Sequence, residues 1–207
     1  MITLTQAMDS LPLVAILRGI KPSEVLEFAD VLVQNGFKVI EIPLNSPSPY
    51  ESIKLLSDKY GKDVVIGAGT VITKEQVDLV QEAGGRIIIS PHSDAELIEY
   101  TKHKKLYSVP GFMTPSEAYR AIHAGADALK LFPADSFGPK GLKAIGTVMP
   151  DIAILPVGGV EPENIPAYID AGASGFGLGS GLYKAGMTLS DFTTKTVRYV
   201  KAIQSSR

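Results

Sequence analysis

The chain has 207 residues, 45% of them hydrophobic, and a formal net charge of -2. This length and hydrophobic content are enough for one sizeable core, so we expect a single domain over residues 1–207. The small net charge, without a basic block, argues against a nucleic-acid-binding surface. The absence of cysteine excludes disulfides and thiol catalysis.

Nothing near the N-terminus predicts export. Residues 1–6 do not form a basic segment followed by an apolar one, as a secretory signal would. No apolar run approaches the roughly 20 residues that a membrane helix needs. The lack of cysteine also fits a reducing compartment. We therefore expect a soluble, cytoplasmic protein that does not bind membranes.

Short β-rich runs alternate with helical segments along the chain. The predicted strands span residues 13–17, 39–42, 64–66, 86–89, 106–109, 126–132, 152–156 and 175–178. The predicted helices, each charged on one face, span residues 23–34, 49–59, 74–82, 94–102 and 115–124, with a terminal helix at 189–204. Strands that alternate with helices indicate βαβ units and a parallel sheet.

Four glycines mark the ends of predicted helices before an apolar run. They occur in the pairs Asn35-Gly36, Ala83-Gly84, Ala124-Gly125 and Ala171-Gly172. Glycine suits the left-handed position at a helix C-terminus. The pairs recur every 40–48 residues or so, about two βα units each, which gives eight strands. We predict a single (β/α)8 barrel with short loops, since typical barrels have about 250 residues. An open, doubly wound sheet is the alternative.

Lys130 lies inside the apolar run 126–132, which is typical of a buried strand. A buried ammonium group is costly unless it is paired or the amine is partly neutral. A neutral lysine amine in a closed site is a nucleophile toward carbonyl carbon, which points to Schiff-base chemistry. The strand period places Ala126, Ala128 and Phe132 on the same face as Lys130.

Glu41 lies in the second predicted strand, on the face opposite the bulky Ile40 and Ile42. The aliphatic side chains should pack against helices, so Glu41 should point into the barrel. Arg18 ends the first strand and Thr70 follows the third. Because the active face of a barrel lies at the C-terminal ends of its strands, these residues and Lys130 could converge there. The alternative is a purely structural buried ion pair between Glu41 and Lys130.

Two glycine-rich segments, 157–160 and 175–181, fall at the seventh and eighth strands. Glycine lets backbone N–H groups approach an anion closely, and the loops after these two strands are the usual phosphate site of such barrels. The alternative is that these glycines only form tight turns. The histidines show no metal-ligand spacing, and the segment 67–69 lacks the third glycine of a dinucleotide fingerprint. We predict no metal and no cofactor.

Taken together, the motifs resemble those of the keto-deoxy-phosphogluconate/phosphogalactonate aldolase family over nearly the whole chain. They are Ala15-Ile16-Leu17-Arg18-Gly19, Ile40-Glu41-Ile42-Pro43-Leu44-Asn45-Ser46, Gly67-Ala68-Gly69-Thr70-Val71, Leu129-Lys130-Leu131-Phe132-Pro133-Ala134, Val157-Gly158-Gly159-Val160 and Gly177-Leu178-Gly179-Ser180. The resemblance implies a class I aldolase, a lyase of sugar-acid pathways such as galactonate degradation. It also implies a homotrimer that acts on a phosphorylated 2-keto-3-deoxy sugar acid.

The resemblance also assigns roles by position. Lys130 matches the Schiff-base lysine and Glu41 the general acid/base. Arg18 and Thr70 match residues that hold the pyruvate end of the substrate. The remaining matches are substrate-binding residues: Pro91 and Phe132 around the imine, Val157 beside the double glycine, and Gly158, Gly159, Gly179 and Ser180 in the phosphate-binding loops.

Two positions bear on the subfamily. Relatives that act on the gluconate substrate or on hydroxyglutarate usually have Leu-Arg-Thr where this chain has Leu44-Asn45-Ser46, and threonine where it has Val157. Both differences favour the phosphogalactonate branch, whose substrate differs in configuration at C4. The phosphogluconate/hydroxyglutarate activity is the alternative. Another phosphate-binding barrel enzyme, or a barrel that only binds a phosphorylated metabolite, would share the glycine loops.

Overall fold

The computed structural model describes residues 1–206, in which short parallel strands alternate with helices. The strands are β1 (Leu13–Ile16), β2 (Val39–Pro43), β3 (Val65–Gly69), β4 (Ile87–Ile89), β5 (Tyr107–Val109), β6 (Gly111–Phe112), β7 (Leu129–Leu131), β8 (Ile154–Pro156) and β9 (Phe176–Leu178). The helices are α1 (Leu4–Ser10), α2 (Pro22–Gln34), α3 (Pro49–Tyr60), α4 (Lys74–Glu82), α5 (Ala95–His103), α6 (Pro115–His123), α7 (Ala134–Gly146), α8 (Ile165–Asp170) and α9 (Leu189–Gln204).

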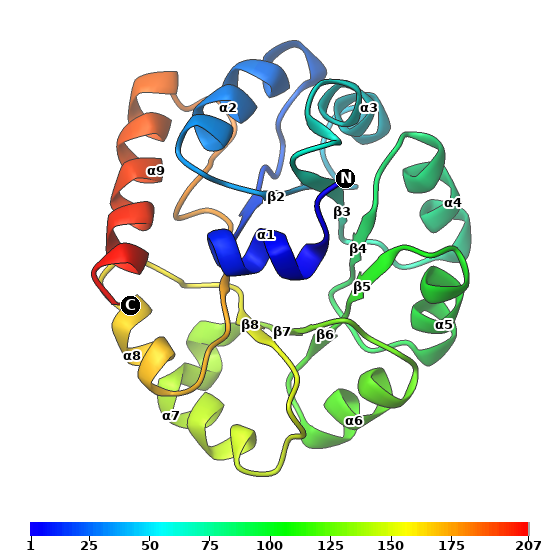
Figure 1. Cartoon of the computed structure of the whole chain (residues 1–207), viewed down its shortest axis with the longest axis vertical. Helices are drawn as coiled ribbons and strands as arrows, with labels where there is room; N and C mark the ends of the chain where they lie inside the picture. The colour runs from blue at the N-terminus through cyan, green and yellow to red at the C-terminus, as the bar shows by residue number, and fades with distance from the viewer. Residues whose placement is uncertain (207) are drawn as a thin grey trace.

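The strands form a ring with helices outside it (Figure 1). One sheet has the order β5-β4-β3-β2-β1-β9, and a second has the order β6-β7-β8. Pro110 alone separates β5 from β6, and a parallel bridge between Val157 and Gly177 joins the two sheets on the other side. With β5 and β6 as two segments of one barrel strand, the ring has eight strands. The predicted (β/α)8 barrel is confirmed, and the alternative of an open sheet is wrong.

The predicted strands and helices differ from those of the structure in the bounds of one strand, in one additional strand and in additional helices. The strand expected at 126–132 is only β7, and Ala126 packs against the outer core rather than facing the barrel interior. The short strand β6 was not expected. Neither were the helices α1 and α7, and α8 was indicated only by the glycine after its end. Within α7, Gly138 adopts non-helical angles of φ 70° and ψ 170°, so the helix is kinked there, and Pro139 begins its second part.

The glycines expected to end helices do so. Gly36, Gly84, Gly125 and Gly172 have φ values of 91°, 86°, 95° and 97°. Side chains with a Cβ rarely adopt this left-handed conformation, so glycine allows each helix to turn sharply into the next strand. Each repeat can therefore be short, which explains how eight βα units fit in this chain.

Apolar side chains form two cores, as the alternation of the strands predicted. Ile40, Ile42, Leu129 and Leu131 belong to the larger core between the strands and the helices. The smaller core, inside the barrel, includes Val14, Val39, Ile89, Val109 and Leu155. The residues that flank Glu41 and Lys130 along their strands thus point outward, and the two ionisable side chains point inward.

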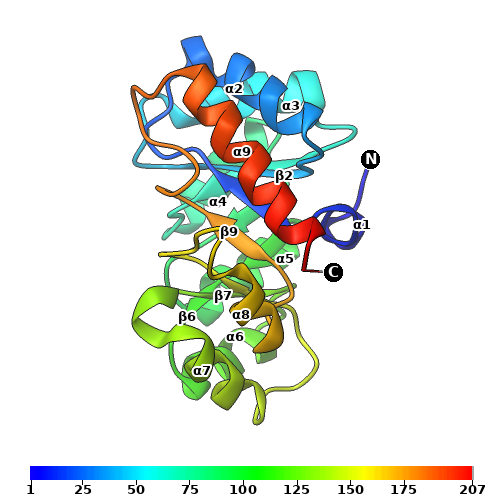
Figure 2. The ribbon, with the colours of Figure 1, turned by 90° about the vertical axis from the view of Figure 1, so that its left-hand side faces the viewer.

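Helix α1 closes one end of the barrel (Figures 1 and 2). Thr3 begins the helix with a reciprocal cap, because Thr3 Oγ1 accepts from the Gln6 amide and Gln6 Oε1 accepts from the Thr3 amide. Leu4 and Ala7 then pack against the inner core. Across residues 1–206, the structure has no helix with the length and apolar character needed to span a bilayer.

Replacing Gly172 with alanine should lower the free energy of unfolding by about 1–2 kcal/mol, because its φ of 97° is unfavourable for any L side chain. The added Cβ meets no atom within 4 Å, so backbone conformation alone sets the cost. Gly146→Ala is the matched control, since its Cβ also meets nothing within 4 Å but its φ is not positive. Gly146→Ala should leave stability unchanged or raise it by up to about 1 kcal/mol. Urea denaturation measures the free energy of unfolding of both variants. Equal changes in the two would contradict the role of Gly172 as the left-handed residue that ends α8.

Candidate active site

Lys130 occupies the middle of β7 and is 5% exposed. Its neighbours along the strand, Leu129 and Leu131, are fully buried on the outer side. The Lys130 Nζ lies 5.0 Å from the centroid of the Phe132 ring, which is itself 40% exposed at the mouth of the barrel. The amine therefore lies below the rim and within reach of a molecule that enters from the mouth.

Glu41 lies in β2 and is 1% exposed. Its Oε2 atom has no hydrogen-bond partner. Gly69 makes this position possible, because a Cβ on Gly69 would lie 1.6 Å from Glu41 Oε2. The carboxyl group and the Lys130 amine do not approach within the 4.0 Å of an ion pair, so the structure lacks the direct buried pair that the structural alternative predicted.

Burial shifts the pKa values of both groups toward their neutral forms. Loss of hydration raises the pKa of Glu41 to about 7, although the positive charges of Lys130 and Arg18 act in the opposite direction. Loss of hydration also lowers the pKa of Lys130; the Glu41 carboxylate opposes this shift and the Arg18 guanidinium adds to it. A carboxyl group that titrates near neutral pH thus lies close to an amine with an increased neutral fraction.

Arg18 follows β1, and its side chain contacts residues that follow β2 and β3. Its Nη1 donates to Asn45 Oδ1 at 2.5 Å, and Nη1 and Nη2 each lie 3.5 Å from Thr70 Oγ1. The structure therefore brings Arg18 and Thr70 together, as expected. The sequence marked Asn45 as a difference from the phosphogluconate/hydroxyglutarate branch of the family, but its contact with Arg18 was not predicted.

A cavity of about 470 Å3 opens at this end of the barrel. Lys130 and Arg18 line it together with Phe132 and four residues of the loops after β8 and β9, namely Val157, Gly158, Gly179 and Ser180. All seven were predicted as site residues. Four further lining residues were not predicted: Ile16, Tyr183, Lys184 and Ala185. Ile16 is the last residue of β1 and belongs to a motif quoted above, although no role was predicted for it. No motif marks Tyr183, Lys184 and Ala185, which follow β9 and reach the mouth only when the ring closes.

The other predicted residues lie around this cavity rather than in its wall. Glu41 lines a space of about 10 Å3 that Lys130 and Val157 also line, so Lys130 lies between Glu41 and the main cavity. Thr70 contacts Arg18. The Pro91 carbonyl packs against Gly111, and Gly159 packs against Asp135. Among residues 1–206 there is no cluster of three or more His, Cys, Asp or Glu side chains that could hold a metal ion.

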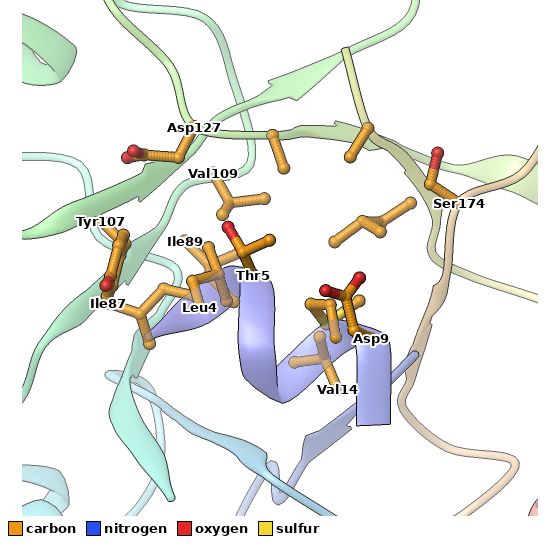
Figure 3. Close-up of a pocket in the computed structure, with 14 residues that line it drawn as sticks. Leu4, Thr5, Asp9, Val14, Ile87, Ile89, Tyr107, Val109, Asp127 and Ser174 are labelled. Atoms are coloured by element: carbon orange, nitrogen blue, oxygen red, sulfur yellow. The ribbon is translucent and has the colours of Figure 1, made fainter. Parts of the chain in front are cut away.

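A second cavity, of about 280 Å3, lies at the opposite end under α1 (Figure 3). Leu4, Thr5 and Asp9 of α1 and strand residues such as Val14 and Ile87 line it, and no lysine or arginine does. Val14, Ile89, Val109 and Leu155 line both this cavity and the small space beside Glu41. These four side chains form an apolar layer between the two ends, so the buried amine faces only the mouth.

Comparison with known proteins agrees with this fold. Residues 4–198 match the family model described as KDPG and KHG aldolase. The 2-dehydro-3-deoxy-6-phosphogalactonate aldolase of Escherichia coli strain K12 is 44% identical over 202 residues, which cover 97% of this chain and 98% of that relative. A protein of Rhizobium meliloti strain 1021, named as a probable enzyme of the same kind, is 43% identical over 192 residues, covering 92% and 91% of the two chains.

A solved structure described as native KDPGal superposes with a TM-score of 0.93 at 45% identity, covering 95% of this chain and 96% of that one. The fold and the buried lysine place the protein among (β/α)8-barrel enzymes. The chain belongs to the KDPG and KHG aldolase family. It is therefore an aldolase, which is a lyase.

Replacing Glu41 with glutamine should change how stability depends on pH. The folded-state pKa of about 7 lies above the ordinary 4.5, so the stabilisation from protonated Glu41 is complete below 4.5 and is lost as the pH rises through about 7. Wild-type stability should fall over this window relative to the variant, by on the order of 3 kcal/mol. Urea unfolding of both proteins between about pH 4 and pH 8 measures this difference. Parallel curves would mean that Glu41 ionises at its ordinary pKa.

Proposed function

We propose that the protein is a class I aldolase that reversibly cleaves 2-dehydro-3-deoxy-6-phosphogalactonate to pyruvate and D-glyceraldehyde 3-phosphate. The observation that carries this proposal is the Lys130 amine, 5% exposed, with a lowered pKa and facing a cavity that Arg18 also lines. The two relatives named for this substrate support the choice within the family.

Lys130 would form the covalent bond to the substrate. Its neutral amine adds to the C2 ketone, and loss of water from the carbinolamine gives an iminium ion. The iminium accepts the electron pair of the C3–C4 bond, so the bond breaks without a free carbanion. The enamine that results takes a proton at C3, and hydrolysis releases pyruvate and the free amine.

Glu41 would move the protons of these steps. With a pKa of about 7 it can both donate and accept a proton near neutral pH, the condition for efficient acid–base catalysis. It would protonate the leaving hydroxyl of the carbinolamine and take the C4 hydroxyl proton as C3–C4 breaks. The space of about 10 Å3 beside Glu41 and Lys130 is near the smallest that holds one water, so transfer through a single water fits this geometry.

Arg18 and Thr70 would bind the carboxylate of the pyruvate half. The guanidinium supplies charge-assisted hydrogen bonds, and its contacts with Thr70 and Asn45 place it at the mouth above Lys130. Phe132, whose ring lies 5.0 Å from the Lys130 Nζ, would cover the imine on one side. Pro91, two residues after the end of β4, would also line the pocket around the imine.

The loops after β8 and β9 would bind the phosphate. Gly158 and Gly159 adopt φ values of 96° and 67°, a conformation that favours glycine, and without a Cβ their backbone N–H groups can approach an anion closely. Gly158, Gly179 and Ser180 line the same cavity as Lys130, and Lys184 adds a positive charge there. A phosphate bound at this position would anchor the substrate and orient its reacting bond.

The enzyme would select the configuration at C4 in the part of the cavity between the carboxylate-binding residues and the phosphate-binding loops. Val157 lines both the main cavity and the small space beside Glu41, so its apolar side chain lies near the proposed reacting atoms. A site without a hydroxyl donor at this position discriminates against a substrate that needs one. A homotrimeric state, a cytoplasmic location and a role in galactonate degradation follow from the family resemblance, and we propose them on that basis alone.

Borohydride reduction in the presence of pyruvate should inactivate the enzyme irreversibly and attach a reduced pyruvyl group at Lys130, because reduction converts the imine into a stable secondary amine. Peptide mass spectrometry locates the modification. Lys130→Ala should carry no label and show no turnover, while Glu41→Gln should slow cleavage by roughly 10²–10⁴. A label on another residue, or none, would sink the proposed mechanism.

Assayed side by side for pyruvate release, the two C4 epimers should differ, with the galactonate epimer cleaved at the higher kcat/KM. Val157→Thr should narrow this preference, because the added hydroxyl can pair with a C4 or C5 hydroxyl of the gluconate epimer. A preference of the wild type for the gluconate epimer or for 4-hydroxy-2-oxoglutarate would instead assign the alternative activity of the family.

A further inference from the structure

We infer that Asn45 is a positioning residue, which holds the guanidinium of Arg18 over the mouth of the barrel so that it can receive the carboxylate of the substrate. This inference rests on the proposed function, since it concerns the arginine that binds the pyruvate half. It goes beyond that function by assigning a role to a residue outside the cavity wall.

The contacts of Arg18 give Asn45 this role. The Arg18 Nη1 donates to Asn45 Oδ1 at 2.5 Å, whereas the Thr70 hydroxyl lies 3.5 Å from both terminal nitrogens, at the limit of a hydrogen bond. Asn45 is therefore the stronger restraint on the guanidinium. An amide oxygen is also neutral, so it orients Arg18 without cancelling the charge that the substrate carboxylate needs.

The residue next to Asn45 fixes the backbone from which Arg18 extends. Gly19 donates its amide to Ser46 Oγ at 2.9 Å, and Ser46 in turn donates its own amide to the Pro43 carbonyl at 2.9 Å. Ser46 is buried, so this contact is shielded from water. The loop after β2 thus holds the loop after β1 at two adjacent points, one on the backbone and one on the Arg18 side chain.

The position of Arg18 also affects the amine of Lys130. The charged groups around that amine come from three places: Glu41 in β2, Arg18 after β1, and Lys184 after β9, which lines the same cavity. Arg18 lowers the pKa of Lys130 and Glu41 raises it. Arg18 is exposed at the mouth, so its effect on Lys130 depends on the distance between the two charges, and the pKa of Lys130 would rise if the guanidinium moved away.

The experiment uses pyruvate alone, so neither the phosphate nor the C4 configuration enters. Exchange of the pyruvate methyl protons in D2O gives the KM for pyruvate, and borohydride trapping across pH gives the midpoint of imine formation. Asn45→Ala should raise the KM about tenfold, as expected for loss of a hydrogen bond to a charged group, and should move the midpoint to higher pH. Ser48→Ala is the control and should change neither, because Ser48 is an exposed residue of the same loop whose side chain makes no capping hydrogen bond to α3.

A second background tests whether Asn45 acts through Arg18. In an Arg18→Met enzyme, adding Asn45→Ala should have no further effect on the KM, because its target is gone. An equal effect in both backgrounds would mean that Asn45 contacts the substrate itself, and the inference would be overturned. An unchanged KM and pH midpoint in Asn45→Ala would overturn it as well. If the wild type fails to trap pyruvate at Lys130, the proposed function fails first and this inference falls with it.

Discussion

The chemistry of this protein depends on burying an amine and a carboxyl group in one narrow space without letting them pair directly. Inside the barrel, the apolar layer of Val14, Ile89, Val109 and Leu155 removes solvent from below. Burial then dominates the pKa of both groups: it lowers that of Lys130 and raises that of Glu41. A close ion pair would reverse both shifts, because each charge would stabilise the other. The separation of the two groups is thus as important as their burial.

Much of this arrangement could be predicted from local sequence. The alternation along residues 39–43 and 129–131 is enough to point Glu41 and Lys130 inward, since a strand has a period of two. The helix-ending glycines predicted the repeat, and with it the barrel. The (β/α)8 fold then places the ends of the strands on one face, which is why residues as distant in sequence as Arg18 and Ser180 line one cavity.

The parts that could not be predicted have physical reasons. Helix α7 consists of two short helical segments that meet at Gly138, whose φ of 70° and ψ of 170° are not helical, and Gly138, Pro139 and Gly141 hide its signal in the sequence. Helix α1 did carry a signal, the Thr3-to-Gln6 capping box, but it has only 7 residues and depends on the inner core for its stability. The contact of Arg18 with Asn45 joins positions 27 residues apart through side chains on two loops, and no periodic pattern records such a pair.

The structure places the proposed reacting groups and the groups proposed to hold the ends of the substrate on different kinds of element. Lys130 and Glu41 lie on strands whose backbones are fixed by neighbours on both sides, β6 and β8 for Lys130 and β1 and β3 for Glu41. Arg18, Asn45, Gly158 and Ser180 lie on loops, where a substitution changes a contact without moving a strand. A substitution in these loops can therefore change the proposed contacts with the substrate while the burial that tunes the amine stays intact. The same reasoning explains how position 45 can be asparagine here although relatives that act on the gluconate substrate or on hydroxyglutarate usually have arginine, because this position lies in the loop after β2 and not in a strand.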